Sequence, residues 1–524
     1  MTRSESRQDK ITKLFLVFLL LIGFFYRFYG LGTNYSFWID EFSTGQAASA
    51  ILKTGHPRTI GGFFESRNLL NHYLTALSLK IFGVSEFAAR FPSVIWGTLM
   101  ISVSFWAFKK FFNGRIGLAV AILITFSMIE ITWSRQARSY ALFQLLFLMS
   151  ACLFYLLFGR IETGKVKLKE VLWLIFFLMI SFLAHPLTFV LLPAALVYGG
   201  FFCRRPLLSI LKKTNKKQRL FGYSVVFGLG FFAWQFAFGD FLRRVFITRR
   251  ISLGIFNHFS FYHAFFWREY GLISFLALLG LIRGFLTKEK KHFFLATVLG
   301  VYLGIVFFFL PWLDIKYLLG VFPVFFFAYL AYFLDDLAEG WFGKKGLIKA
   351  VFLFLSIVFI IFNGHKFTFR PRVYYSPNAD MRRIPLVDYN LVYAKIRSQV
   401  GKGDQTVAVV DTWGDRIAWY LGRDYPAAFW LRKQKNYQLK GGKKIDTIYH
   451  YGVILNEADL KSVIQDYPQG FIFIDGHELP FLPIDALDYL RDNLKPELEF
   501  TRFSLDPDPY DTWPAWLYSW GVKG

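Results

Sequence analysis

The feature that most constrains this chain is a series of long apolar stretches over its first two thirds. A helix that crosses the hydrocarbon core of a bilayer needs about 20 mostly apolar residues. Eleven stretches approach that length, at residues 14–30, 88–108, 116–133, 139–158, 170–184, 187–203, 219–239, 271–286, 291–311, 316–334 and 347–363. Hydrophobic residues make up 55% of the chain, more than a soluble domain of 524 residues requires. The sequence therefore predicts a polytopic, mainly α-helical membrane protein.

One further apolar stretch, residues 69–82, is short and carries polar residues such as Asn71 and Lys80. We interpret it as an amphipathic helix that lies in the membrane interface. Short cytoplasmic loops collect Lys and Arg. If 69–82 is not a span and the N-terminus is cytoplasmic, every basic loop falls on the cytoplasmic side, at 109–115, 160–169, 204–219, 283–291 and 344–349. Counting 69–82 as a span would move all of these loops outside, so we expect eleven spans.

Charge and cysteine content narrow the classes of function. The formal net charge is +24, from 60 basic and 36 acidic residues. Because the excess lies largely in the loops just named, it indicates membrane topology and excludes nucleic acid as the partner. Cys152 and Cys203 lie in apolar stretches, so no disulfide framework is expected. The basic N-terminus precedes an apolar run without a small-residue cleavage site, which predicts a retained first span in the cell (inner) membrane.

This topology divides the chain into two units. Residues 1–365 form the transmembrane unit, whose first external loop covers about 32–87, and residues 366–524 follow on the outer side. Strand-like runs at 405–411, 446–452 and 470–475 alternate with helix-like runs at 389–400, 415–423 and 456–467. The alternation predicts a small extracytoplasmic α/β domain, and recognition of an acceptor is one role open to it. Its aromatic tail, 509–520, either packs against the domain, which we favour, or stacks on sugar rings.

Two neighbouring acids, Asp40 and Glu41, follow the first predicted span and are candidate catalytic residues. Consecutive side chains do not share a face of a helix, so the two carboxylates should point different ways. One can then act on a substrate while the other holds the loop. The alternative is that Asp40 only caps the helix expected over 41–55.

A second group, Glu65, Arg67 and His72, lies at the start of the interfacial helix and is predicted to bind substrate. Glu65 is a candidate second carboxylate, joining Asp40 around a hydroxyl or a hard cation. Its alternative role is that of a first-turn acid that complements the helix dipole.

Basic residues on the outer side form the remaining candidates. Arg135, Arg138 and Tyr140 crowd a very short external loop, and Lys316 and Tyr317 head a later span. Arginines on the outer side run against the positive-inside tendency, so they indicate an anionic partner, for which a phosphate is the natural choice. Lipid headgroups are the alternative partner. Further arginines at 243, 244, 249 and 250 lie among aromatic residues, as in a segment that touches headgroups.

Four stretches of the chain resemble a known family. They are "FWIDEFSTGQAASAILKTG", "ESRNLLNHYLTALSLKIFGVSEFAARFPSVIWGTL", "SRQARSYALFQLL" and "IKYLLGVFPVFFFAYLAYF". They resemble the protein O-mannosyltransferase family and its relative, the lipid A aminoarabinose transferase, within the lipid-dependent glycosyltransferases of the C-type fold. The resemblance covers most of the chain to about residue 365, and the Asp-Glu pair after the first span is its most specific element.

The resemblance implies an enzyme that takes a sugar from a polyprenyl phosphate at the outer face without a nucleotide. Asp40 matches the acid that engages the acceptor as a base. Glu65 matches a Glu that, with Asp40, can join a metal site in the aminoarabinose transferase relatives. In those relatives Lys and Pro follow this Glu, whereas Ser66 and Arg67 follow Glu65 in this chain. The resemblance therefore assigns the phosphate contact to Arg67 and leaves open whether a divalent metal binds.

Elementary chemistry agrees with an inverting glycosyltransferase acting on a protein hydroxyl, a lipid or a glycan. Displacement of a polyprenyl phosphate builds charge on the leaving phosphate, which outward-facing Arg and Lys would stabilise. An acceptor hydroxyl needs a carboxylate within hydrogen-bond reach. The alternative is a transporter or flippase of lipid-linked saccharide, which would carry its polar residues in mid-span. A channel or structural membrane protein would not explain acids and arginines converging outside.

Overall fold

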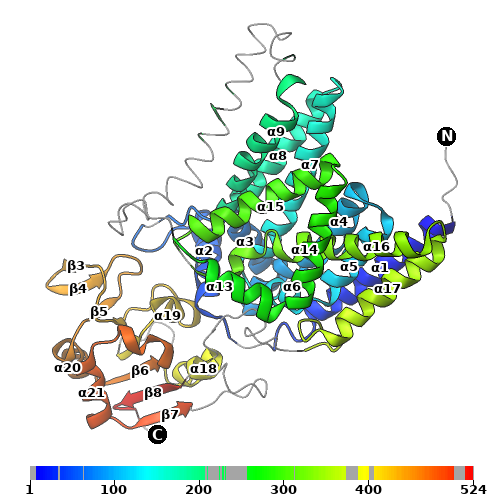
Figure 1. Cartoon of the computed structure of the whole chain (residues 1–524). Helices are drawn as coiled ribbons and strands as arrows, with labels where there is room; N and C mark the ends of the chain where they lie inside the picture. Colours follow the sequence, from blue (N-terminus) through cyan, green and yellow to red (C-terminus); the bar gives the residue numbers. More distant parts are fainter. Residues whose placement is uncertain are drawn as a thin grey trace.

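The computed structural model describes residues 7–33, 36–62, 64–206, 256–311, 313–372, 387–400, 406–500 and 514–522, together with 209, 224, 227, 228 and 231. A bundle of helices and a smaller sheet domain make up the molecule (Figure 1). The bundle contains α1 (Arg7–Phe28), α2 (Ile39–Thr54), α3 (Leu69–Phe82), α4 (Glu86–Phe111), α5 (Gly114–Phe126), α6 (Met128–Ser134), α7 (Tyr140–Glu162), α8 (Leu168–Ala184), η1 (Pro186–Val190), α9 (Leu191–Phe202), α13 (Phe259–Ala264), η3 (Phe265–Glu269), α14 (Gly271–Leu286), α15 (Lys290–Phe308), η4 (Ile315–Leu318), η5 (Phe322–Phe326), α16 (Phe327–Phe342) and α17 (Gly346–Asn363).

Within the described residues, five helices are long and apolar enough to cross a membrane: α1, α4, α7, α15 and α17. A sixth span results if the segment Phe259–Glu269, which comprises α13 and η3, is counted as one crossing with α14, which it meets at a bend of 104°. Two shorter apolar helices cover Gly114–Phe126 and Pro186–Phe202. The multi-pass helical class is therefore as predicted, whereas the count of eleven spans is not confirmed. The predicted span 219–239 and the arginines at 243–250 lie outside the described residues.

Two predicted spans are broken in the structure. The stretch 116–133 divides into α5 and α6 at Ser127, because a distant segment pairs with its backbone. Met128 N donates to the carbonyl of Lys366 at 2.9 Å, and Thr368 N donates to that of Phe126 at 3.0 Å. The stretch 316–334 begins with the 3₁₀ turn η4 and the π-helical turn η5 before α16 starts.

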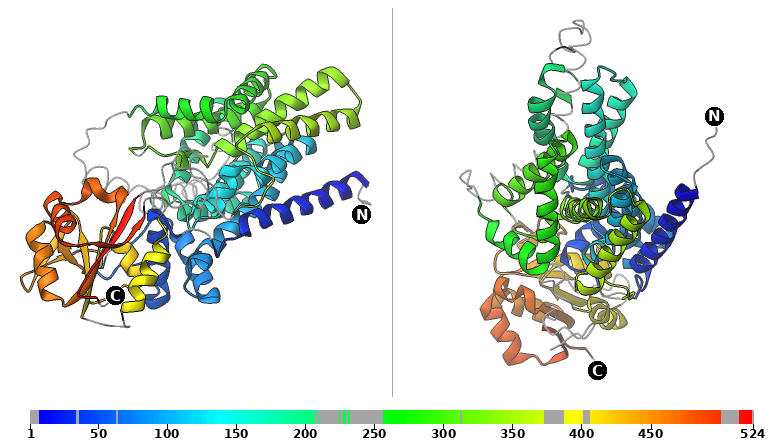
Figure 2. Two further views of the ribbon diagram at one scale, coloured as in Figure 1. Left: turned by 90° about the horizontal axis from the view of Figure 1, so that it is seen from below. Right: turned by 45° about the vertical axis from the view of Figure 1, so that its right-hand side comes forward.

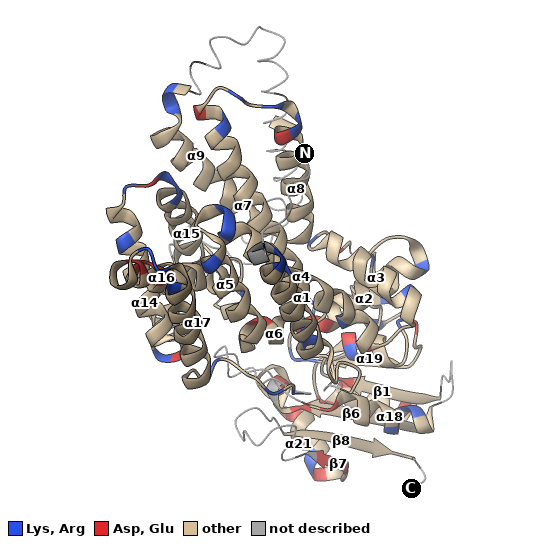
Figure 3. Ribbon diagram, turned by 90° about the vertical axis from the view of Figure 1, so that its right-hand side faces the viewer, with Lys and Arg blue, Asp and Glu red and all other residues tan. Residues whose placement is uncertain are grey.

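Two of the loops that the charge pattern assigns to one side, 160–169 and 283–291, lie together. Lys290 Nζ is 2.8 Å from Glu162, and Arg160 is 3.4 Å from Glu170. Figure 3 shows basic residues at the ends of α7, α8 and α9 that point away from the sheet domain. The N-terminal end of α1 is also remote from that domain (Figure 2).

The C-terminal domain is built on one eight-stranded sheet in the order β3-β4-β5-β2-β1-β6-β8-β7. Its strands are β1 (Val407–Asp411), β2 (Ala428–Leu431), β3 (Tyr437–Lys440), β4 (Lys443–Asp446), β5 (Gly452–Ile454), β6 (Gln469–Asp475), β7 (Pro496–Phe500) and β8 (Ala515–Trp520). Its helices are α18 (Tyr389–Gln399), α19 (Gly414–Tyr420), α20 (Glu457–Asp466), η7 (Gly476–Phe481) and α21 (Ile484–Asn493). The central strands β5, β2, β1 and β6 are parallel, and antiparallel strands extend the sheet on both sides.

One predicted strand is wrong. Residues 446–452 form the end of β4, a turn and the start of β5, because the Asp446 carboxylate accepts hydrogen bonds from the amides of Ile448, Tyr449 and Tyr451. An Asp that bonds the backbone a few residues on favours a turn over a strand.

Alternate residues of the sheet face two separate cores. Ala408, Val410, Ile472 and Ile474 pack with α20 and α21, while the opposite face packs with α18 and α19. The core on the side of α18 and α19 extends beyond the domain. It also contains residues of the transmembrane unit, namely Phe37, Phe42, Ala48, Ala76, Leu79, Ala88, Ala89 and Ala137. The first external loop and the C-terminal domain therefore share one hydrophobic core.

Polar contacts reinforce this junction. Ser36 Oγ lies 3.1 Å from Asp388 Oδ1, and Gln46 Nε2 donates to the carbonyl of Asp415 at 3.2 Å. The Tyr420 hydroxyl donates to Glu86 Oε1 at 2.6 Å. The domain is thus fixed to α2, which carries Asp40 and Glu41, and to the start of α4, which carries Arg90, the partner of Glu41.

The carboxyl ends of the parallel strands, where open α/β sheets usually bind ligands, are filled by protein. Arg416 is fully buried and its Nη2 and Nη1 donate to Asp411 at 2.6 Å and to Asp475 at 2.8 Å. The Tyr389 hydroxyl donates to Asp475 at 2.6 Å. Residues 411–416 therefore supply an internal ion pair of the domain.

Candidate active site

Asp40 lies in the first turn of α2, and two basic residues from distant segments converge on it. Lys316 Nζ donates to Asp40 Oδ2 at 3.1 Å, and Arg138 Nη2 lies 3.5 Å from the same oxygen. Arg138 Nη1 also donates to the Asp40 carbonyl at 2.8 Å. We call these three residues the Asp40 cluster. The Asp40 side chain is 32% exposed, so its carboxylate is paired yet accessible.

Aromatic rings and a further acid surround the two cations. Lys316 lies 5.8 Å from the ring centre of Trp38 and 5.6 Å from that of Tyr317, and Arg138 lies 5.9 Å from that of Tyr140. Asp314 caps η4 through the amide of Lys316 and pairs with its Nζ at 2.8 Å. The predicted residues Tyr140 and Tyr317 thus lie beside the cluster.

Glu41 has the opposite surroundings from its neighbour. Its carboxylate is completely buried and accepts hydrogen bonds from Arg90 Nε at 2.8 Å, Arg90 Nη2 at 2.9 Å and the amide of Ala137 at 2.7 Å. It also accepts from the amide of Trp38 at 3.2 Å, so Glu41, and not Asp40, binds the capping backbone of α2. The alternative that Asp40 only caps its helix is therefore wrong. Glu41 holds the loop around Arg138, and a direct catalytic contact for it stays a prediction.

Arg135 is turned away from the cluster. Its Nη1 donates to the carbonyls of Tyr26, Arg27 and Tyr29 at 3.2, 3.0 and 2.6 Å, at the C-terminal end of α1. A cation at this end of a helix binds carbonyls that lack a partner within the helix. The geometry gives Arg135 a role in joining α1 to the external loop, and its predicted substrate contact finds no support from these bonds.

Glu65, Arg67 and His72 form a second group near the cluster. Arg67 Nε donates to Glu65 Oε1 at 3.1 Å, and the side chains are 41% and 18% exposed. Glu65 precedes α3 and is paired with Arg67, so it does not serve as a first-turn acid of that helix. Burial lowers the pKa of His72 to about 4; Glu65 opposes this shift, and Arg138 and Arg67 add to it. His72 is therefore neutral at pH 7.

These acids do not fit a metal site. In the part of the chain that the structure describes, no group of three or more His, Cys, Asp or Glu side chains could hold a metal ion. Asp40 is paired with two cations and Glu65 with Arg67, and such neighbours oppose the binding of a further cation.

The sequence reasoning missed the residue that holds Glu41. Arg90 is 1% exposed and its Nη1 also lies 3.8 Å from Glu86, which in turn binds Tyr420 of the C-terminal domain. The available signal was its position inside the predicted span 88–108, because an ionisable residue within a span is rarely without a partner. His185 lies at the C-terminal end of α8, where its Nδ1 accepts a hydrogen bond from the amide of Leu187.

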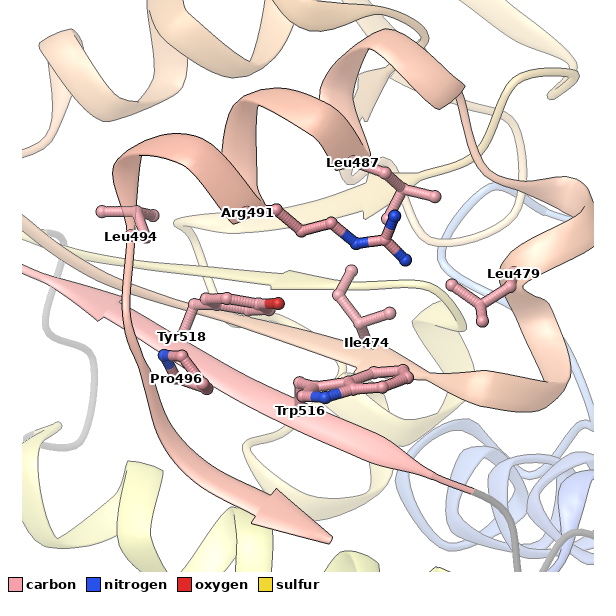
Figure 4. A pocket seen from close by; sticks show the side chains of 8 residues that line it. All are labelled: Ile474, Leu479, Leu487, Arg491, Leu494, Pro496, Trp516 and Tyr518. Atoms are coloured by element: carbon pink, nitrogen blue, oxygen red, sulfur yellow. The ribbon is translucent and has the colours of Figure 1, made fainter. Parts of the chain in front are cut away.

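Residues 515–520 of the aromatic tail form β8 and pack in the sheet, as we favoured, whereas 509–513 lie outside the described residues. Two residues of β8 also line a cavity of about 250 Å³. Figure 4 shows Arg491 of α21 reaching across this cavity above Trp516 and Tyr518. The cavity lies on the face of the sheet that packs with α20 and α21, away from α2. Stacking on a sugar at this place stays a prediction.

Comparisons with known proteins agree with this architecture. Residues 66–232 match the family model of dolichyl-phosphate-mannose-protein mannosyltransferase. A comparison with curated protein sequences finds no match. The structure is similar to ArnT from Cupriavidus metallidurans bound to undecaprenyl phosphate, with a TM-score of 0.58 and 11% identity over 97% of this chain and 98% of that chain.

It is also similar to the archaeal oligosaccharyltransferase AglB from Archaeoglobus fulgidus, in complex with an inhibitory peptide and a dolichol-phosphate. The TM-score is 0.54, with 10% identity over 91% of this chain and 70% of that chain. At these identities the likeness shows the fold. The predicted C-type glycosyltransferase fold and the resemblance to the mannosyltransferase family are thereby confirmed.

Proposed function

We propose that this chain is an inverting glycosyltransferase that moves a sugar from a polyprenyl-phosphate donor to an acceptor at the outer face of the cell membrane. The observation that carries the proposal is the Asp40 cluster, in which one accessible carboxylate and two cations meet from three separate segments. The family match and the similarity to structures that contain undecaprenyl phosphate and dolichol-phosphate support a lipid-borne donor.

Arg138 and Lys316 are the groups that would receive the donor phosphate. Displacement at the anomeric carbon leaves negative charge on that phosphate, and cations already in place stabilise it without reorganisation. Their side chains are each 13% exposed, so water screens them little. Arg67, which is 41% exposed, is positioned to add a further contact with the phosphate.

Asp40 would take the proton of the acceptor hydroxyl. In the structure both cations lie near its carboxylate and favour its charged form. When a donor phosphate draws Arg138 and Lys316 to itself, that stabilisation weakens and the carboxylate becomes a stronger base. A single displacement from the opposite face inverts the anomeric carbon. If the acceptor is itself a phosphate, Asp40 only orients it.

The sidedness of this site is part of the proposal. The basic ends of α7, α8 and α9 are remote from the C-terminal domain, which fits a cytoplasmic position for these ends and an outer position for the site. The acceptor, whether protein, lipid or glycan, then belongs to the cell envelope.

The test is sugar transfer from defined polyprenyl-phosphate donors by membranes that contain the parent or Asp40→Asn. General-base catalysis contributes about 10²–10⁴-fold, so we expect turnover to fall at least a hundredfold with bound donor retained. Asp488→Asn, at an exposed carboxylate of α21, is the matched control and should leave turnover unchanged.

Unchanged turnover in Asp40→Asn would refute the role of the base. The result would instead support a flippase if intact lipid-linked saccharide moved across the vesicle membrane and no sugar was released from the phosphate.

A further inference from the structure

A pocket of about 660 Å³ lies where the end of α2 and the following loop meet the C-terminal domain. The external loop lines it with Lys53, His56 and Arg58, and the C-terminal domain with Arg423 and Asp424. We call it the interface pocket. Lys53 follows Asp40 by thirteen residues of one helix, so the two sites are about 20 Å apart. The interface pocket is thus separate from the Asp40 cluster.

Positive charge exceeds negative charge in this pocket. Lys53, Arg58 and Arg423 face the single acid Asp424 among the residues that line it. Asp424 Oδ1 lies 3.5 Å from Lys53 Nζ, and these side chains are 79% and 59% exposed. An exposed pair of this kind is weak and readily exchanged for another anion.

Arg423 carries the strongest indication of a ligand. The residue is only 7% exposed, and its Nη2 donates to the carbonyl of Arg58 at 2.5 Å. Its Nε is buried and has no hydrogen-bond partner among the described residues. A buried guanidinium donor without an acceptor is costly, and an anion in the pocket would remove that cost.

We propose that the interface pocket binds a phosphate-type anion, a phosphomonoester or a pyrophosphate group. Arginine presents donors in a planar fork that matches phosphate oxygens, and Lys53 adds a mobile point charge. The ligand can be a free phosphate compound or the headgroup of an anionic lipid, because both offer the same oxygens. The site does not depend on the proposed transferase activity, and its test measures binding alone.

The first arm of the test uses the full-length protein in neutral detergent and titrates it with pyrophosphate by calorimetry. The variant is Lys53→Gln with Arg58→Gln, since both side chains are exposed and their loss should leave the fold intact. Loss of two charge-assisted contacts should weaken binding at least about tenfold. Lys440→Gln, at an exposed lysine of β3, is the matched control and should bind like the parent.

The second arm places the same proteins in nanodiscs of phosphatidylcholine with added phosphatidylglycerol and counts retained anionic lipid by native mass spectrometry. Weakened pyrophosphate binding in the variant supports a free phosphate ligand, and reduced lipid retention alone supports a headgroup. Equal binding by parent and variant in both arms overturns the proposal. Thermal unfolding of each variant without ligand verifies that it is folded.

Discussion

Asp40 and Glu41 occupy one turn of α2 and have opposite surroundings. The Asp40 side chain is 32% exposed, whereas Glu41 is fully enclosed by Arg90 and the amides of Trp38 and Ala137. A carboxylate with every oxygen engaged inside the protein orients its neighbours and has little freedom to meet a substrate. The expectation that one acid acts and the other holds the loop therefore fits the geometry of both residues.

Glu41→Gln should be strongly destabilising. The substitution leaves the buried Arg90 with only the more distant carboxylate of Glu86, 3.8 Å away, and breaking a buried pair in this way costs about 3–5 kcal/mol. The measurement is thermal unfolding in detergent. As a control, Glu457→Gln removes an exposed pair with Lys461 and should leave stability nearly unchanged. Similar shifts in the unfolding midpoint for the two variants would contradict the structural role of the Glu41–Arg90 pair.

His72 should make the protein sensitive to acid. Its pKa is about 4 in the folded chain against an ordinary value of 6.5, so between these values the unfolded chain binds more protons. The stability it contributes is complete above pH 6.5 and falls by roughly 3 kcal/mol as the pH drops towards 4. Unfolding midpoints at several pH values should show a shallower acid slope for His72→Gln. The exposed His365→Gln should keep the parent's slope, and an identical slope for His72→Gln would disprove the prediction.

At the scale of elements, the close approach of α2 and α19 fixes the site to the C-terminal domain. Phe37 and Trp419 lie 4.9 Å apart between ring centres. A Cβ at Gly45 would come within 2.8 Å of Trp419 and 3.0 Å of Phe37. Only glycine allows the two helices to pack at this distance.

Gly45→Ala should therefore force α19 away from α2 and cost about 1–3 kcal/mol. Gly304→Ala in α15 is the matched control, because a Cβ there meets nothing within 4 Å. That variant should be neutral or more stable by about 0.5–1 kcal/mol, since alanine is the better helix former. Thermal unfolding compares the two, and a loss in both would show that helix propensity and not contact decides the effect.

Sequence patterns predicted the helices whose formation depends on interactions between residues close together in the chain. The interfacial helix over 69–82 is α3 itself, and the helix-like runs at 389–400, 415–423 and 456–467 contain α18, α19 and α20. The break at Ser127 was not foreseen, because it depends on backbone bonds to residues 366–368, far along the chain. The strands β7 and β8 were not foreseen for a similar reason, since they depend on sheet neighbours.

The sequence also predicted some residues of the site correctly and misassigned others. Asp40, Arg138 and Lys316 were identified by residue type and by their shared side of the membrane, and the structure brings them together. Arg135 has the same sequence context as Arg138 but binds the end of α1. Only two residues lie between these arginines, so only tertiary structure could assign their different roles.

At the scale of the whole molecule, the two units form one folding body. The core beneath α18 and α19 contains Phe37, Phe42 and Ala48 of the external loop. The transmembrane unit alone would expose these side chains to water, and a patch of that kind promotes aggregation. The segment that carries Asp40 thus depends on a domain that supplies no residue to the Asp40 cluster.

Residues 1–372 expressed alone should accordingly aggregate and lack transferase activity. Co-expression with residues 387–524 should restore a monodisperse complex, because the shared core joins the fragments without a covalent link. Size-exclusion chromatography and the sugar-transfer assay check both outcomes. A monodisperse, active product from 1–372 alone would contradict the shared-core interpretation.

The long separation between the halves of this core has a consequence for biosynthesis. Ser36 and Asp388 are 352 residues apart, so the segment before α2 is synthesised long before the domain that covers it. At roughly 5–20 residues per second, that interval lasts on the order of 20–70 s. Throughout it the nascent loop must rest on lipid or on a chaperone, and the enzyme matures only when the ribosome has almost finished.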